Sequence, residues 1–187
     1  GTATAPITFT TAATTVTPGG WFSIQFPAGS SGHLERCVVN SAGRGGHAAL
    51  FIASSDVVVQ DCRIHHNAST GVYVGGAAPT LTGSAIYFNG GPGLVTSNSQ
   101  PILRGNLFYR NTGFGIRNDT PARVVNARYQ AWGHPSGPYH PARNSAGLGD
   151  RVSDGVEFDP WLRVSGLTIP GHQPPQALVV EPAADGF

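Results

Sequence analysis

The segments Asn67-Ala-Ser-Thr-Gly71-Val72, Asn89-Gly-Gly-Pro-Gly93-Leu94 and Asn111-Thr-Gly-Phe-Gly115-Ile116 are three versions of one phrase. Each phrase is an asparagine, three variable residues, a glycine and an aliphatic residue, and successive copies start 22 residues apart, at 67, 89 and 111. Self-similarity with a fixed period of this length is typical of solenoids, in which each repeat stacks on the next.

The apolar residues keep the same register. The aligned sets are Val59, Leu81 and Leu103; Ile64, Ile86 and Phe108; and Val72, Leu94 and Ile116. Around them residues alternate with period two, as in short strands with one buried face, and no window keeps a helical period. A unit of three short strands and three turns is one rung of a parallel β-helix, whose rungs pair at about 4.8 Å. We therefore predict an all-β, right-handed parallel β-helix of about five 22-residue coils, since right-handed crossovers are the strong preference.

The repeated asparagines and glycines are interpreted as structural residues. The asparagines are expected to turn inward and to hydrogen-bond one another up the stack, as in Asn ladders. The explanation offered for both residue types is a turn with positive φ, which glycine adopts freely and asparagine more readily than most. The residues concerned are Asn67, Asn89, Asn111, Gly71, Gly93 and Gly115.

One loop is predicted to be longer than its counterparts. Leu34 aligns with Val59 at an offset of 25 residues, whereas Leu50 aligns with Val72 at 22. The three extra residues place segment 40–47 outside the repeat, as a bulge on the side of the solenoid. Loops that depart from a repeat often carry function, and a neutral insertion is the alternative.

The repeat divides the chain into four segments. They are an N-terminal strand or cap (1–20), the coils (21–125), a C-terminal cap (126–164), and a Pro-rich linker with a possible terminal strand (165–187). We expect the apolar run 177–181 to fold back on its own helix, because a free strand seeks an unpaired edge; docking on a neighbouring subunit is the alternative.

Composition narrows the setting. The chain of 187 residues has no lysine, 11% charged residues and a net charge of +1. The chain therefore lacks the excess of basic residues that is typical of nucleic-acid-binding proteins. It also contains no run of about 18 apolar residues, so no membrane span is predicted. The chain opens at Gly1, without methionine or signal peptide, which indicates a mature or excised fragment.

The two cysteines occupy the same position in successive coils. Cys37 and Cys62 should therefore lie within the range that a disulfide allows. We favour two free thiols packed in the core, and neither cysteine has the CxxC spacing of a zinc or redox site.

After residue 125 a different pattern follows. It contains Asn126 to Trp132-Gly133, then Ser136-Gly137-Pro138, Gly149-Asp150-Arg-Val152-Ser153 and Pro160-Trp161-Leu162. This stretch resembles the C-terminal signature of bacterial secreted right-handed parallel β-helix repeat proteins, in which Asn-Trp-Trp-Gly, Ser-Gly-Pro, Gly-Asp-x-Val-Ser and Pro-Trp-Leu follow the last coil. Ala131 stands where that signature has its first Trp. The resemblance, over roughly residues 20 to 165, implies the fold and an extracellular or cell-surface location, and it transfers no activity.

Large apolar residues in this stretch are expected to cover the last rung. They are Trp132, Phe158, Trp161 and Leu162. Four nearby acids offer a calcium or catalytic cluster as one interpretation and backbone-bonding turns as the favoured one. The acids are Asp150, Asp154, Glu157 and Asp159. No cofactor is expected, with calcium as the alternative.

No catalytic residue is assigned. A glycosidase needs two carboxylates about 5 to 10 Å apart, and no outward column of the coils stacks two acids. The acids of the coils are Glu35, Asp56, Asp61 and Asp119. Asp61 is interpreted as a surface ion pair with Arg36.

Two neighbouring columns suggest a ligand site. One contains Asn40, His65, Tyr87 and Tyr109, and the next Ser41, His66, Phe88 and Arg110. Rings at rung spacing offer faces to sugars, and the loop with Arg44 and His47 lies at the lower end of the same corner. We predict a glycan site there, with stacked structural aromatics and an inward Phe88 as the alternative.

Three functions of different classes follow. The leading hypothesis is an extracellular, non-catalytic β-helix module for surface display, adhesion or glycan contact. The others are a polysaccharide-active enzyme, lyase-like or hydrolase-like, and a structural subunit that self-associates into a polymer or filament through its terminal strand or solenoid ends.

Overall fold

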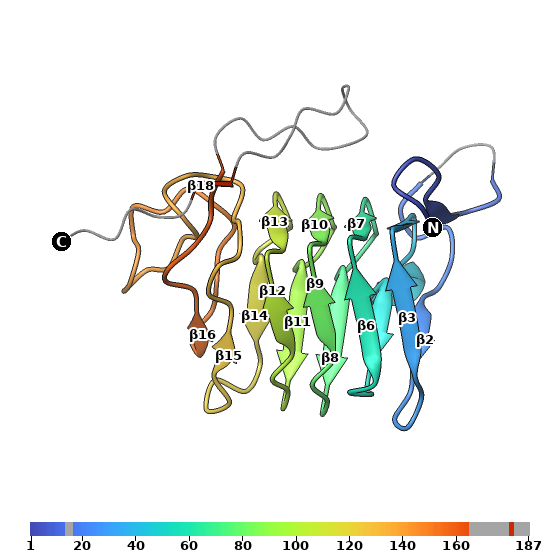
Figure 1. The fold of residues 1–187 in the computed structure, drawn as a ribbon, viewed down its shortest axis with the longest axis horizontal. Coiled ribbons are helices and arrows are strands. Elements are labelled where there is room, and N and C mark those ends of the chain that lie inside the picture. Colours follow the sequence, from blue (N-terminus) through green and yellow to red (C-terminus); the bar gives the residue numbers. More distant parts are fainter. Residues whose placement is uncertain (14–16, 165–179, 182–187) are drawn as a thin grey trace.

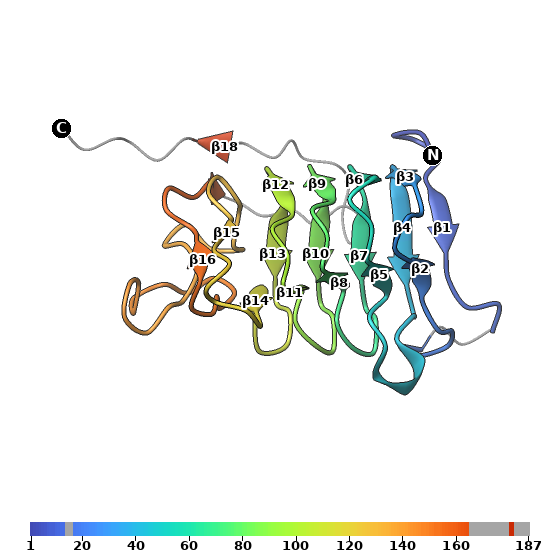
Figure 2. The same ribbon diagram turned by 90° about the horizontal axis from the view of Figure 1, so that it is seen from below.

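Three parallel sheets wind into one solenoid in the computed structural model, which describes residues 1–13, 17–164 and 180–181 (Figures 1 and 2). Sheet A contains β1 (Ile7–Phe9), β4 (Cys37–Asn40), β7 (Arg63–His65), β10 (Ala85–Tyr87) and β13 (Leu107–Tyr109). Sheet B contains β2 (Ile24–Phe26), β5 (Leu50–Ile52), β8 (Val72–Gly75), β11 (Leu94–Ser97) and β14 (Ile116–Asn118). Sheet C contains β3 (Gly32–Glu35), β6 (Val57–Gln60), β9 (Thr80–Thr82) and β12 (Ile102–Arg104).

Each rung passes from sheet C to sheet A to sheet B, and the all-β solenoid fold is confirmed. Sheet C has four strands, so about four rungs carry all three sheets, against the expected five coils. The difference lies at the N-terminal end, where β1 and β2 extend sheets A and B without a partner strand in sheet C.

The observed register is the one that the repeat predicts. Leu34, Val59, Leu81 and Leu103 are partners across sheet C, and the aliphatic columns of sheets A and B align in the same way. These inward side chains form one continuous core, and most are fully buried. Because the alternation buries one side of every strand, a slip of one residue would expose the whole column.

The long loop lies where the offset predicts. The chain leaves β4 at Asn40, forms a single 3-10 turn η1 (Arg44–Gly46) and enters β5 at Leu50. It extends beyond the equivalent loops of the next rungs (Figure 2).

The repeated glycines have a different cause from the expected positive φ. Gly71, Gly93 and Gly115 are absent from the residues with positive φ, and so are the repeated asparagines. An added Cβ at Gly71 would lie 2.7 Å from the carbonyl oxygen of Gly93, and one at Gly93 would lie 2.8 Å from that of Gly115. The rungs thus approach so closely here that only glycine fits.

The left-handed conformation falls instead on the residue just before each ladder position. Between sheets A and B these residues are Ser41, His66, Phe88 and Arg110, with φ of 61°, 51°, 51° and 52°. Between sheets C and A they are Arg36, Asp61, Gly83 and Gly105, with φ of 49°, 51°, 59° and 60°. A left-handed residue reverses the backbone so that the next side chain points into the core.

The asparagines form a hydrogen-bonded ladder. Asn67 Nδ2 donates to Asn89 Oδ1 at 2.9 Å, and Asn89 Nδ2 donates to Asn111 Oδ1 at 2.9 Å. Each amide also bonds a backbone group, for example Asn89 Nδ2 to Ile64 O at 3.1 Å. The ladder ends on the cap, where Asp150 Oδ2 accepts from Asn111 Nδ2 at 2.9 Å.

A second ladder, which the repeat did not reveal, lines the corner between sheets C and A. Ser84 Oγ accepts from Cys62 N at 3.0 Å, Asn106 Oδ1 accepts from Ser84 N at 3.0 Å, and Gln130 Oε1 accepts from Asn106 N at 2.9 Å. Cys62 therefore begins a column of inward polar side chains.

Aromatic residues cover the last rung. The Trp132 ring is fully buried and stacks on Phe108, with centroids 5.4 Å apart and planes 24° apart. Phe158 joins the same core, and Trp161 packs against it. Beyond the coils lie β15 (Val125–Asn126), which pairs in parallel with β16 (Val156–Glu157).

The end of the described chain pairs with itself. Strand β17 (Arg163–Val164) pairs in antiparallel fashion with β18 (Val180–Glu181). The last two residues of the terminal apolar run, 180–181, thus pair with the cap segment of the same chain, and its first residues, 177–179, lie outside the described residues.

Candidate functional site

Six side chains form what we call the aromatic corner, where sheet A turns into sheet B. They are His65, His66, Tyr87, Phe88, Tyr109 and Arg110. His65, Tyr87 and Tyr109 end three neighbouring strands of sheet A as register partners. His66, Phe88 and Arg110 follow them in the left-handed conformation.

The rings of the corner interlock rather than form a flat stack. His65 lies parallel to Tyr87, with centroids 4.8 Å apart and planes 18° apart. Phe88 meets Tyr87 and Tyr109 edge to face, at 5.7 and 5.5 Å. The Arg110 guanidinium lies 5.2 Å from the centroid of Tyr109 and 5.9 Å from that of Phe88. Aromatic faces and a cation are therefore held in one rigid cluster.

Accessibility differs among these side chains. Tyr87 is only 4% exposed, and its burial raises the pKa of the phenol, while the positive charge of Arg63 opposes the rise. Tyr109 and Phe88 are half-buried, and Arg110 is exposed. Phe88 is outside the buried core cluster, so it does not point into the solenoid as the alternative interpretation has it. His66 is exposed as well, and His65 is half-buried, so every side chain of the corner except Tyr87 contributes surface to a ligand.

The long loop brings a separate aromatic contact. His47 packs against Phe22, with centroids 4.0 Å apart. Arg44 is tied down by hydrogen bonds to the carbonyl oxygens of Gly19 and Gly20. Ser69 Oγ, in the loop of the next rung, donates to Gly46 O at 3.0 Å. Arg44 and His47 thus lie on the loop that follows the aromatic corner within the first full rung.

The opposite turn, between sheets C and A, is what we call the polar corner. Its left-handed residues are Arg36, Asp61, Gly83 and Gly105. Arg36 contacts the carboxylates of Glu35 at 2.5 Å and Asp61 at 3.8 Å, and all three side chains are partly exposed. Such ion pairs are worth well under 1 kcal/mol. The corner borders a cavity of about 300 Å³ that Arg36, Asp61 and both cysteines help to line.

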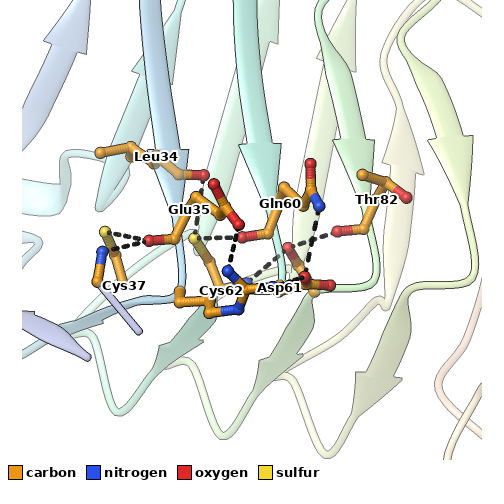
Figure 3. Close-up of polar contacts among 10 residues, drawn as sticks. Leu34, Glu35, Cys37, Gln60, Asp61, Cys62 and Thr82 are labelled. Atoms are coloured by element: carbon orange, nitrogen blue, oxygen red, sulfur yellow. Dashed lines mark hydrogen bonds and ion pairs between the residues drawn. The ribbon is translucent and has the colours of Figure 1, made fainter. Parts of the chain in front are cut away.

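The cysteines lie directly beneath this corner (Figure 3). Both are buried free thiols; Cys37 Sγ donates to Glu35 O at 3.3 Å, and Cys62 Sγ to Gln60 O at 3.2 Å. Burial raises the pKa of Cys62 from its ordinary 9.0 to about 11. A thiol with so high a pKa is a poor nucleophile at neutral pH, so Cys62 has the properties of a ladder residue rather than of a reactive centre.

The acids of the cap are dispersed among separate partners. Asp150 ends the asparagine ladder, and Asp154 lies 3.3 Å from the buried His140 ring. Glu157 lies between Arg143 at 3.4 Å and Arg128 at 3.7 Å. Among residues 1–13, 17–164 and 180–181, no group of three or more His, Cys, Asp or Glu side chains is arranged to hold a metal ion.

Sequence reasoning missed a second stacked pair on the outer face of sheet B. Phe51 and Tyr73 are register partners of β5 and β8, with ring centroids 5.4 Å apart and planes only 6° apart. Their spacing of 22 residues is the signal that would have found them. Because the rings face one another, they mainly stabilise neighbouring rungs.

The geometry defines a solenoid of the parallel β-helix class. The family model described as the right handed beta helix region matches residues 10–127, which is more than half of the chain. The chain belongs to this right-handed β-helix family. No curated protein and no solved structure matched the chain in the corresponding searches. In the described part of the chain, no helix is long and apolar enough to cross a membrane.

Proposed function

We propose that the chain is an extracellular, non-catalytic β-helix module that contacts polysaccharide through the aromatic corner. One observation carries the proposal: three successive rungs place His66, Phe88 and Arg110 in the left-handed conformation. That conformation costs a non-glycine residue about 1 to 2 kcal/mol. Strained residues of this kind gather at functional sites, where the side chain serves a purpose that outweighs the cost.

The polar corner provides the internal comparison. In the rungs of Phe88 and Arg110, the equivalent left-handed positions are Gly83 and Gly105, which avoid the strain; in the rung of His66 the position is Asp61. The aromatic corner has no glycine in its coils at these positions. Bulky side chains there project outward, since the next residue in each rung, an asparagine, is the one that points inward.

The chemistry of the corner suits a sugar polymer. Half-buried rings offer apolar surface to the C–H faces of pyranoses, and the exposed Arg110 offers donors to hydroxyl or carboxylate oxygens. The surface is preformed by the stacked rungs, so little ordering is needed on binding. An extracellular or cell-surface location is part of the proposal, and the resemblance of the cap motif to that of secreted β-helix proteins supports it.

Two substitutions test the proposal by isothermal titration against neutral and uronic-acid polysaccharides. Tyr109→Leu removes the flat ring but keeps apolar volume, and Arg110→Asn removes the cation at a residue type that tolerates positive φ. We expect micromolar to millimolar affinity in the wild type, weakened about 3- to 10-fold by each change. Arg104→Asn is the matched control, because Arg104 is an exposed arginine of the same rung on sheet C.

Wild-type affinity in both corner variants would overturn the proposal. Release of reducing ends or of unsaturated uronate from these polymers would overturn its non-catalytic part.

A further inference from the structure

The cap holds a recess that is separate from the aromatic corner. Its volume is about 430 Å³, within the range of small-molecule sites. The lining residues are Arg143, Glu157, Phe158, Asp159 and Trp161. All five come from the segment after the coils, for which the sequence favoured a capping role, with a calcium or catalytic cluster that includes Glu157 and Asp159 as the alternative.

Trp161 is fixed as a flat wall of this recess. Its Nε1 donates to Pro135 O at 3.1 Å, which sets the orientation of the ring. The ring packs on Gly137 so closely that a Cβ there would have no room. Contact with a backbone glycine occupies one part of the indole, while Trp161 as a whole stays partly exposed and lines the recess. A partly exposed indole held in this way is a ready platform for an apolar ligand face.

The charged groups of the recess balance one another. The Arg143 guanidinium lies 4.5 Å from the centroid of Phe158 and 3.4 Å from Glu157, and Arg128 lies 3.7 Å from the same carboxylate. Asp159 is exposed and makes no ion pair with any residue that the structure describes. With two arginines, one glutamate and one aspartate, the local charge is zero. The recess therefore favours neither an anionic nor a cationic ligand, and its Asp159 oxygens are available to accept hydrogen bonds.

We propose that this recess binds one pyranose residue of a neutral polysaccharide, with the sugar face against Trp161 and sugar hydroxyls donating to Asp159. The ligand class rests on the proposed function, but the residues do not overlap with the aromatic corner. The two sites lie close together. The Tyr109 ring packs on Gly133, and the Trp161 ring packs on Gly137. These two glycines flank a turn in which Gly137 N donates to His134 O at 3.1 Å. Four residues span at most about 14 Å, so one polymer chain can contact both.

The test uses the full chain with cellohexaose, laminarihexaose, mannohexaose and polygalacturonate as probes. Binding is followed by titration calorimetry and by tryptophan fluorescence. The fluorescence change should come from Trp161, because Trp132 is fully buried and Trp21 precedes β2, at the end of the solenoid opposite the cap (Figure 1). We expect saturable binding of at least one neutral hexaose and weaker binding of polygalacturonate, because a uronate carboxylate placed against Asp159 meets a like charge although the recess as a whole is neutral.

Asp159→Asn and Trp161→Phe are the test variants, and Asp56→Asn is the control, an exposed carboxylate on the coils. Asp159→Asn should weaken binding about 10-fold, since hydrogen bonds to a charged acceptor are the stronger kind, and Trp161→Phe should abolish the fluorescence change. Thermal melting of each variant verifies folding, and because the Asp159 side chain is exposed, Asp159→Asn should melt as the wild type does.

The outcomes separate the two proposals. Loss of binding in Asp159→Asn with retention in Arg110→Asn supports the recess and counts against the aromatic corner. The reverse pattern overturns the recess and leaves the proposed function standing. Saturable binding of none of the neutral hexaoses, or equal affinity in the folded Asp159→Asn variant and the wild type, overturns the recess.

Discussion

The aromatic corner and the polar corner are built on one backbone pattern but use it differently. In both, a left-handed residue is followed by an inward polar side chain that bonds the next rung. At the polar corner the left-handed position changes from Arg36 and Asp61 to Gly83 and Gly105. At the aromatic corner it changes from Ser41 to the bulky His66, Phe88 and Arg110, and in these three rungs the inward position is asparagine.

The difference separates two tasks that share a turn. The inward residue sets the spacing and direction of the rungs, so its chemistry is restricted to groups that bond the backbone above it. The side chain of the left-handed residue points outward. It need not bond the backbone of the next rung, so its type is unrestricted and the main cost of a non-glycine residue there is the backbone strain. Function is therefore expected at the left-handed positions and stability at the residues that follow them.

The largest effect should come from filling the close contact between rungs. Gly93→Ala would put a Cβ 2.8 Å from both Asn111 Nδ2 and Gly115 O, so the backbone must shift. We expect a loss of about 3 kcal/mol or more in the free energy of unfolding, measured with urea. Gly105→Ala is the matched substitution at the polar corner: φ is 60° and no atom lies within 4 Å of the added Cβ, so only the left-handed cost of about 1 kcal/mol applies. Equal losses would contradict crowding between rungs as the reason for glycine at position 93.

The two ladders allow a comparison of similar residues. Asn89→Ala removes bonds to Ile64 O and to two asparagines, and Asn106→Ala removes bonds to Leu81 O and Gln130. Each should cost about 1 to 3 kcal/mol, because buried backbone partners lose their bonds. An unchanged melting temperature for Asn89→Ala would show that the ladder adds nothing to stability.

Most of the fold could be predicted because a solenoid repeats its constraints. The 22-residue spacing gives the register of all three sheets and the extra length of the loop before Leu50. The spacing could not show why glycine repeats at these positions. The reason is contact with the backbone of Gly93 and Gly115, and this contact depends on the distance between rungs. The second ladder could not be predicted either. Its members are four different residue types that share only the capacity to hydrogen-bond: Cys62, Ser84, Asn106 and Gln130.

The site was harder to predict than the fold. Spacing placed Tyr87 and Tyr109 in one column, but it could not show that Tyr87 is 4% exposed while Arg110 is open. The recess at Trp161 depends on the irregular cap, where no repeat fixes which side chains meet. A periodic sequence shows which residues align in one column of the solenoid, whereas the exposure of each side chain depends on how its neighbours pack.

High pH tests whether Cys62 belongs to the polar ladder. Its pKa of about 11 in the folded chain exceeds the ordinary 9.0, so the unfolded chain loses the thiol proton first. Between pH 9 and 11 the folded state binds more protons, and stability should fall with rising pH by about 2 kcal/mol from this group. Cys62→Ser should remove this component of the pH slope while costing less than about 1 kcal/mol at pH 7, since a hydroxyl can donate to the same carbonyls. Urea unfolding at pH 7, 9 and 11 measures both, and an identical slope in the variant would contradict the assignment.

The smallest effect concerns the end of the asparagine ladder at Asp150. Its partial burial raises the pKa of the carboxyl group, although the N–H groups of Asn111 and the backbone of Arg110 oppose the rise. A raised carboxyl pKa means that the folded chain holds the proton more tightly than the unfolded chain. The stability linked to this proton is complete below the ordinary aspartate pKa of 3.8 and is lost as pH rises through the raised value.

Asp150→Asn keeps an oxygen that can accept from Asn111 Nδ2 and carries no charge at any pH. We expect it to alter stability by less than about 1 kcal/mol at pH 7 and to remove the loss between pH 3 and pH 7 that is specific to Asp150. Melting curves of the two proteins over that range decide the matter. A variant that is much less stable at pH 7 would mean that the ladder needs a negative charge at its cap end, which would set the aromatic corner further apart from the polar corner, where Gln130 ends the ladder without one.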